Sequence, residues 1–129
     1  MGIKIVRYIP TILWLVAILV ASFMPSQHLS PQLMLFPHQD KVIHFAMYFG
    51  LAFLFLYDTK KSQNLSNVFI IVSVVCITCL SGLVEYLQPI LSNRSKDGFD
   101  LFANGTGAMV AGSIIKLFFC KNYEHEIEV

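Results

Sequence analysis

Residues 68–87 read VFIIVSVVCITCLSGLVEYL, an apolar stretch that contains a single acid, Glu85. A helix needs roughly 20 predominantly apolar residues to cross the ~30 Å hydrocarbon core of a bilayer. A single segment in that environment satisfies its backbone polar groups only as a helix. The stretch therefore predicts a transmembrane helix, and it decides the fold class.

Three further apolar stretches accompany this one. Of the 129 residues, 56% are hydrophobic and only 13% are charged, which excludes an ordinary soluble domain. A chain of this length is also too short for two separate cores. We predict an all-α membrane protein, a single domain over residues 1–129 folded as a bundle of four transmembrane helices. The helices are expected at about 5–24, 40–57, 67–88 and 98–120.

The first stretch has a second interpretation. Lys4 and Arg7 precede an apolar run, and the small residues Ala21 and Ser22 resemble a cleavage site, as in a signal peptide. The run continues through Met24, beyond that site, which favours a retained helix. Whether the segment is cleaved stays open.

The distribution of lysine and arginine predicts the orientation. With the amino terminus inside, six basic residues lie near the cytoplasm and three lie outside, which favours cytoplasmic termini at both ends. The protein is then expected in the cytoplasmic membrane, with loops 25–39 and 89–98 outside and a polar turn at 58–67 inside. The inner set is Lys4, Arg7, Lys60, Lys61, Lys116 and Lys121, and the outer set is Lys41, Arg94 and Lys96.

Polar side chains gather at two junctions between the apolar stretches, both on the expected outer side. Ionisable groups at the edge of hydrocarbon are costly unless paired, so they are candidates for a functional site. Spacings of three and four residues place them on shared helical faces. The candidates are Asp40, Lys41, His44 and Tyr48 on the second helix, Glu85 and Gln88 on the third, and Arg94, Asp97, Asp100 and Asn104 around the start of the fourth.

Structural roles explain part of this set. Asp97 could cap the fourth helix, and Lys41 and Arg94 could anchor the chain at the membrane surface. Tyr48 could pack in the core. Small residues four apart, including Gly107, predict that the fourth helix packs closely and lies at the centre of the bundle.

Glu85 is harder to explain in this way, because it lies inside an apolar stretch. An unpaired buried charge is strongly unfavourable, so its carboxylate needs a cation. We expect Arg94 as the partner, then Lys41, then His44. Arg94 comes first because only a short loop separates it from Glu85.

Together the polar residues form three motifs in a fixed order. This ordered set resembles the signature of VanZ-like membrane proteins, from about residue 38 to residue 112. Members of that family often have glycine directly before the acid, whereas this chain has Val84 there. The resemblance implies a small multi-pass membrane protein associated with resistance to teicoplanin-type glycopeptide antibiotics. The motifs are Asp40-Lys41-x-x-His44-x3-Tyr48, Glu85-Tyr86-x-Gln88 and Arg94-x-x-Asp97-x-x-Asp100-x3-Asn104-x-x-Gly107.

Two functions remain open on these residues. The first is binding or protection of an envelope component, such as a lipid-linked wall precursor or an anionic lipid, with Lys41 and Arg94 contacting phosphate. A glycopeptide is a further possible partner, whereas nucleic acid is not expected. The second is an enzyme that acts on lipid-linked substrates by acid–base or metal-assisted chemistry.

The metal reading has two forms. Glu85 with Asp97 and Asp100 would suit Mg²⁺ or Ca²⁺, whereas zinc would require His44 together with acids. We favour binding, for which no metal and no cofactor is expected. A third possibility is that the polar network only holds the helices together.

Overall fold

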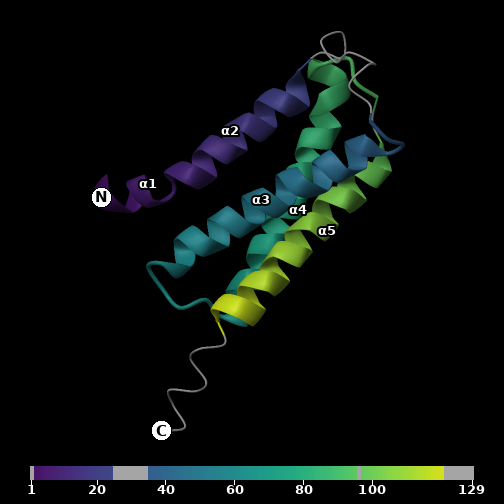
Figure 1. Cartoon of the computed structure of the whole chain (residues 1–129). Coiled ribbons are helices and arrows are strands. Elements are labelled where there is room, and N and C mark those ends of the chain that lie inside the picture. The colour runs from purple at the N-terminus through teal and green to yellow at the C-terminus, as the bar shows by residue number, and fades with distance from the viewer. Residues whose placement is uncertain (1, 25–34, 96, 121–129) are drawn as a thin grey trace, which may run out of the picture.

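The structure is a computed structural model that describes residues 2–24, 35–95 and 97–120 (Figure 1). Lys96 and Lys121, used above for the orientation, and most of loop 25–39 lie outside these ranges. Within the described residues every regular element is helical, which confirms the all-α prediction. The elements are α1 (Gly2–Arg7), α2 (Ile9–Phe23), α3 (Gln39–Lys60), α4 (Asn67–Leu91), α5 (Gly98–Ile114) and the π-helical segment η3 (Ile115–Phe119).

Three of these helices are long and apolar enough to cross a membrane. They are α3 with 22 residues, α4 with 25, and α5 continued by η3, which together run 22 residues from Gly98 to Phe119. Large apolar side chains remain exposed along them, as lipid-facing surfaces require. These features fit a helical bundle in a membrane.

The first apolar stretch differs from its prediction. It does not form one helix over 5–24, because the chain breaks at Tyr8 and the apolar part, α2, has only 15 residues. Pro10 lies in the first turn of α2. Proline suits this position because the first amides of a helix have no partner within the helix.

Two other helices extend beyond their expected ends. α3 continues to Lys60, so Asp58 is a buried residue of its last turn and does not belong to the polar turn where we placed it. α4 continues to Leu91 and includes Pro89, which we expected in the outer loop. Proline has no N–H to donate to the carbonyl four residues earlier, that of Glu85, and a helix tolerates the loss of one bond in its last turns.

The closest helix pair is α3 and α5, which run side by side in Figure 1. A β-carbon at Gly107 of α5 would overlap the backbone carbonyl of Phe45 on α3, and it would touch the Phe49 amide at 3.0 Å. Small residues permit this kind of approach between membrane helices. α3 also packs against α2 and α4, and α4 packs against α2, α3 and α5, so no single helix holds the central place that we expected for the fourth.

The bundle has two polar ends. At one, Thr11 near the start of α2 donates to Asp58 at the end of α3. At the other, Gln88 near the end of α4 donates to the backbone carbonyl of Ser22 at the end of α2. We call these the Asp58 end and the Glu85 end. Between them lies an apolar core that includes Tyr48, Leu51, Ala52, Ile77, Ala108 and Ala111.

Candidate functional site

The Glu85 end brings together residues from three helices that are far apart in sequence. As predicted from the helical spacing, the polar stripe of α3 faces those of α4 and α5. The side chains form two adjoining clusters, and Asp100 belongs to both. The residues that meet are Asp40, Lys41 and His44 from α3, Glu85 from α4, and Asp97, Asp100 and Asn104 at the start of α5.

The outer group, which we call the Lys41 cluster, places three carboxylates around one ammonium. Lys41 Nζ donates to Asp40 Oδ2 at 2.9 Å, to Asp97 Oδ2 at 2.6 Å and to Asp100 Oδ1 at 2.5 Å. A lysine ammonium has three donors, and all three are used here. The Lys41 ammonium therefore has no donor left for a ligand.

Asp97 also caps α5, as one of our interpretations expected. Its Oδ1 accepts from the backbone amide of Phe99 at 3.0 Å while its Oδ2 accepts from Lys41. The Lys41 ammonium, and after it the Phe99 amide, hold the pKa of the Asp97 carboxyl below its ordinary value of 3.8. Asp97 thus fixes both the start of the helix and the position of Lys41.

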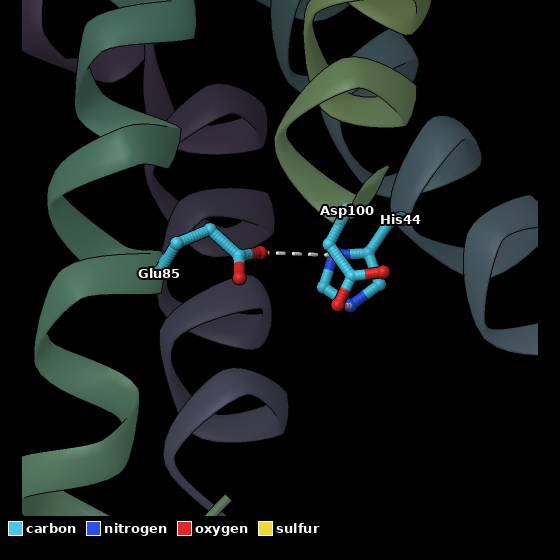
Figure 2. A group of neighbouring side chains, drawn as sticks. All are labelled: His44, Glu85 and Asp100. Carbon is cyan, nitrogen blue, oxygen red and sulfur yellow. Dashed lines mark ion pairs between the residues drawn. The ribbon is translucent and has the colours of Figure 1, made fainter. Parts of the chain in front are cut away.

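The inner group, which we call the His44 cluster, consists of His44, Glu85, Asp100 and Asn104, all buried. His44 Nδ1 lies 3.2 Å from Asn104 Oδ1 and 3.6 Å from Glu85 Oε1. Its Nε2 lies 3.6 Å from Asp100 Oδ2, and Asn104 Nδ2 donates to Glu85 Oε1 at 3.4 Å. Figure 2 shows the Glu85 carboxylate reaching from α4 towards His44 and Asp100.

The contacts of the two clusters differ in kind. Those of Lys41 have the lengths of strong charged hydrogen bonds, whereas two contacts of His44 exceed hydrogen-bond length. Glu85 Oε2 is buried and has no hydrogen-bond partner among the described residues. The hydrogen-bonding groups of the His44 cluster are therefore less completely paired than those of the Lys41 cluster, although the His44 cluster is more deeply buried.

The expected partner order for Glu85 is wrong. His44, placed third, is the cationic candidate nearest to its carboxylate. Lys41 is held by three other acids, and Arg94 directs Nη1 to the backbone carbonyl of Ala21 at 3.5 Å. A short loop brings Arg94 near Glu85 along the chain, but it does not determine where a long side chain points.

Two other predicted residues line the interior rather than either cluster. Tyr48 is buried in the apolar core, which matches its structural interpretation. Gln88 is buried and holds α4 to α2 through the Ser22 carbonyl, with a bond of 3.1 Å.

A polar cavity of about 360 Å³ lies beside the Lys41 cluster, and we call it the polar pocket. It places Arg94 beside carboxylates of the Lys41 cluster. Two residues that we did not single out, Asn93 and Ser95, also belong to it, and their position in the loop beside Arg94 was the available signal. The lining residues are Asp40, Gln88, Asn93, Arg94, Ser95, Asp97 and Asp100.

Comparison with known proteins agrees with the motifs. The model of the VanZ/LLP1 family matches residues 7–119, a range that contains α2 to η3, both clusters and the polar pocket. No significant match was found among curated proteins or among solved structures. The family match and the three long apolar helices together indicate a membrane protein. The resemblance drawn from the ordered motifs is confirmed, and the chain belongs to the VanZ/LLP1 family.

Proposed function

We propose that the protein binds the polar head group of a cell-envelope lipid in the polar pocket. The supporting observation is the place of this pocket, a polar cavity of about 360 Å³ at one end of apolar helices. Exposed apolar side chains, including Ile90, Leu91 and Phe99, lie on the helices next to it. A lipid can therefore keep its hydrocarbon chain along the helices while its head group enters the pocket.

Arg94 is the group that suits a phosphate. A guanidinium binds phosphate through paired hydrogen bonds, and the existing contact of Arg94 with the Ala21 carbonyl, at 3.5 Å, is long. Lys41, to which we also gave this role, is already bound by three carboxylates. The phosphate contact in the proposal therefore belongs to Arg94 alone.

The carboxylates of the pocket suit the rest of such a head group. Asp40 and Asp97 are partly exposed, so the remaining lone pairs of their carboxylate oxygens can accept hydrogen bonds from sugar hydroxyls or peptide amides. A ligand with a phosphate at one point and several donors beyond it matches this arrangement better than a simple anion. A lipid-linked wall precursor has this chemistry.

Titration of the purified protein in nanodiscs with an undecaprenyl-type lipid carrying a sugar–peptide head group tests the proposal. Arg94→Ala should weaken binding by about 10- to 100-fold, because charged hydrogen bonds contribute about 1.5–3 kcal/mol each. Arg7→Ala, which removes an arginine from α1, outside the pocket, is the matched control and should bind normally. Equal affinity of Arg94→Ala and the unchanged protein would contradict the proposal.

The proposal includes an exterior position for the pocket. It rests on the six-to-three distribution of basic residues. Reporter fusions at Lys61 and at the carboxyl terminus should read cytoplasmic, and fusions at Gln32 and Ser92 should read exterior. An exterior signal at Lys61 would place the pocket in the cytoplasm and exclude a wall precursor on the outer surface.

Protection against a teicoplanin-type glycopeptide is the cellular outcome that the family resemblance adds to the proposal. Cells that produce the protein should then survive a higher drug concentration than cells that produce the Arg94→Ala variant at equal membrane abundance. If the variant protects equally well, the pocket has no part in protection.

An enzyme remains the second candidate, and the His44 cluster is the observation that favours it. An imidazole between two buried carboxylates is an arrangement that can move protons. Product formation from the same lipid, followed by mass spectrometry, separates the two functions. A product whose formation requires His44 would establish catalysis.

A further inference from the structure

We infer that the His44 cluster binds one divalent metal ion of the type that imidazole and carboxylates share, with Zn²⁺ as the reference ion. His44, Glu85 and Asp100 each offer a ligand atom, and these atoms lie within 4.8 Å of one another. All three residues are buried and come from three different helices (Figure 2). The inference goes beyond head-group binding and does not depend on it, because the metal ion alone is the ligand.

The spacing of the ligand atoms suits a shared ion. Nδ1 and Nε2 of His44 lie 3.6 Å from Glu85 Oε1 and from Asp100 Oδ2 respectively, which is too long for a hydrogen bond. Two ligand atoms that each lie ~2.0–2.1 Å from one zinc ion are roughly 3.3–3.6 Å apart. The two contacts use different nitrogens of the ring, and one ion takes only one of them. One ligand atom from each residue nevertheless lies within 4.8 Å of the other two, so side-chain rotation that brings these three atoms closer together would complete the site.

The Glu85 carboxylate supplies an independent observation. This side chain is only 3% exposed, and its Oε2 has no hydrogen-bond partner among the described residues. Buried polar atoms in folded proteins nearly always have a partner, so an unpartnered carboxylate oxygen needs an explanation. A bound cation would satisfy this oxygen and offset the burial of its charge.

The surrounding residues are arranged as a supporting shell. Asp100 gives Oδ1 to Lys41 and turns Oδ2 towards His44, while Asn104 donates to Glu85 Oε1. Such contacts orient metal ligands. A donor set of one nitrogen and several oxygens favours zinc or manganese over Mg²⁺ and Ca²⁺, which prefer oxygen alone.

The neighbouring group of three acids does not make a second site. Asp40, Asp97 and Asp100 also lie close enough to share an ion. The Lys41 ammonium already stands between them, within 2.9 Å of each. Because the Lys41 ammonium already neutralises these three acids, the His44 cluster is the remaining candidate for metal binding.

The test is calorimetric titration of tag-free, chelator-treated protein in detergent with Zn²⁺ and, separately, with Mn²⁺. One ion should bind per chain. Glu85→Gln should weaken binding by more than about 100-fold, because changes in the supporting shell alone typically cost 10- to 100-fold. Two matched controls should bind normally: Asp58→Asn neutralises the buried acid at the opposite end of the bundle, and His38→Asn removes the histidine that precedes α3.

A measurement on the unchanged protein guards against loss of fold in the variants. The imidazole nitrogen signals of His44 should shift on addition of Zn²⁺ in an NMR spectrum, while those of His38 stay in place. Absence of stoichiometric binding, an undisturbed His44, or binding that survives Glu85→Gln but fails in Asp58→Asn would overturn the inference. Lipid titration of the metal-free protein tests head-group binding separately, so either proposal can fail alone.

Discussion

The most deeply buried carboxylates at the two ends of the bundle, Asp58 and Glu85, have different surroundings. Asp58 is 1% exposed, and its oxygens accept from Thr11 at 2.9 Å and from Lys61 at 3.3 Å. Glu85 is 3% exposed, and it receives one long bond of 3.4 Å from Asn104 while its second oxygen has no partner among the described residues. The bundle is therefore able to satisfy a buried acid fully, and it does so only at one end.

The local charge explains the contrast. Asp58 pairs with Lys61, the residue that caps the end of the same helix, and with a hydroxyl on α2, so its neutralisation is local. Among the residues that the structure describes, the Glu85 end carries more acids than lysines and arginines, since Asp40, Glu85, Asp97 and Asp100 lie there with Lys41 and Arg94. We interpret the Asp58 end as structural and the Glu85 end as the site where an external group completes the balance of charge.

The largest effect is expected where α3 and α5 meet. Gly107→Val would push a side chain into the backbone of Phe45, and the free energy of unfolding should fall by about 3 kcal/mol, the upper range for overpacking. Because this contact holds both clusters together, the Glu85 end should be lost first. Gly98→Ala is the control, since a β-carbon there meets nothing within 4 Å. Thermal unfolding in detergent measures both, and equal stability would show that the helices are free to separate.

A matched pair of neutral variants tests the comparison directly. Asp58→Asn should lower the free energy of unfolding by about 1.5 kcal/mol, because it replaces a charged hydrogen-bond acceptor. Glu85→Gln should change it by less than about 1 kcal/mol in either direction, because neutralising a poorly paired buried charge removes a penalty. The measurement is denaturant unfolding in the presence of chelator. A larger loss for Glu85→Gln would reverse our assignment of the two ends.

The smallest effect concerns acid sensitivity at Asp97. Lys41 holds the pKa of this carboxyl below its ordinary value of 3.8, so its contribution to stability is complete above that value. The contribution is lost as the pH falls through the lower pKa of the folded state. Asp97→Asn should therefore flatten the decline of stability in acid while leaving its pH dependence near neutrality unchanged. An unchanged acid profile would show that the contact with Lys41 adds nothing.

The sequence predicted which polar residues lie together at the Glu85 end better than it predicted the pairs that they form. Spacings of four residues placed Asp40, His44 and Tyr48 on one face of α3, and short connections brought α4 beside α5. The same reasoning chose Arg94 as the partner of Glu85 and failed, because distance along the chain does not fix the direction of a flexible side chain. Which charged side chains pair depends on their rotamers, and the packing of all the helices determines those rotamers.

The sequence also contained correct signals for some helix ends and misleading signals for others. Pro10 marks the start of α2, and this signal could have revealed the break at Tyr8. Pro89 was a misleading signal: it predicted the end of the helix, whereas α4 continues through it to Leu91. Asp58 was missed because it lies one residue beyond the predicted apolar stretch, where a polar residue is equally compatible with a turn. The hydroxyl of Thr11 on another helix and the ammonium of Lys61 together make its burial favourable.

The shortness of α2 has a consequence for the surrounding lipid. Its 15 residues span roughly 22 Å, against ~30 Å for the hydrocarbon core of a typical bilayer. A membrane that accommodates this hydrophobic mismatch becomes thinner beside α2. The end of α2 contacts Gln88 and Arg94, so the thinning would draw lipid phosphates towards the rim of the polar pocket. The same mismatch would sort the protein towards thinner regions of the membrane, independently of any ligand.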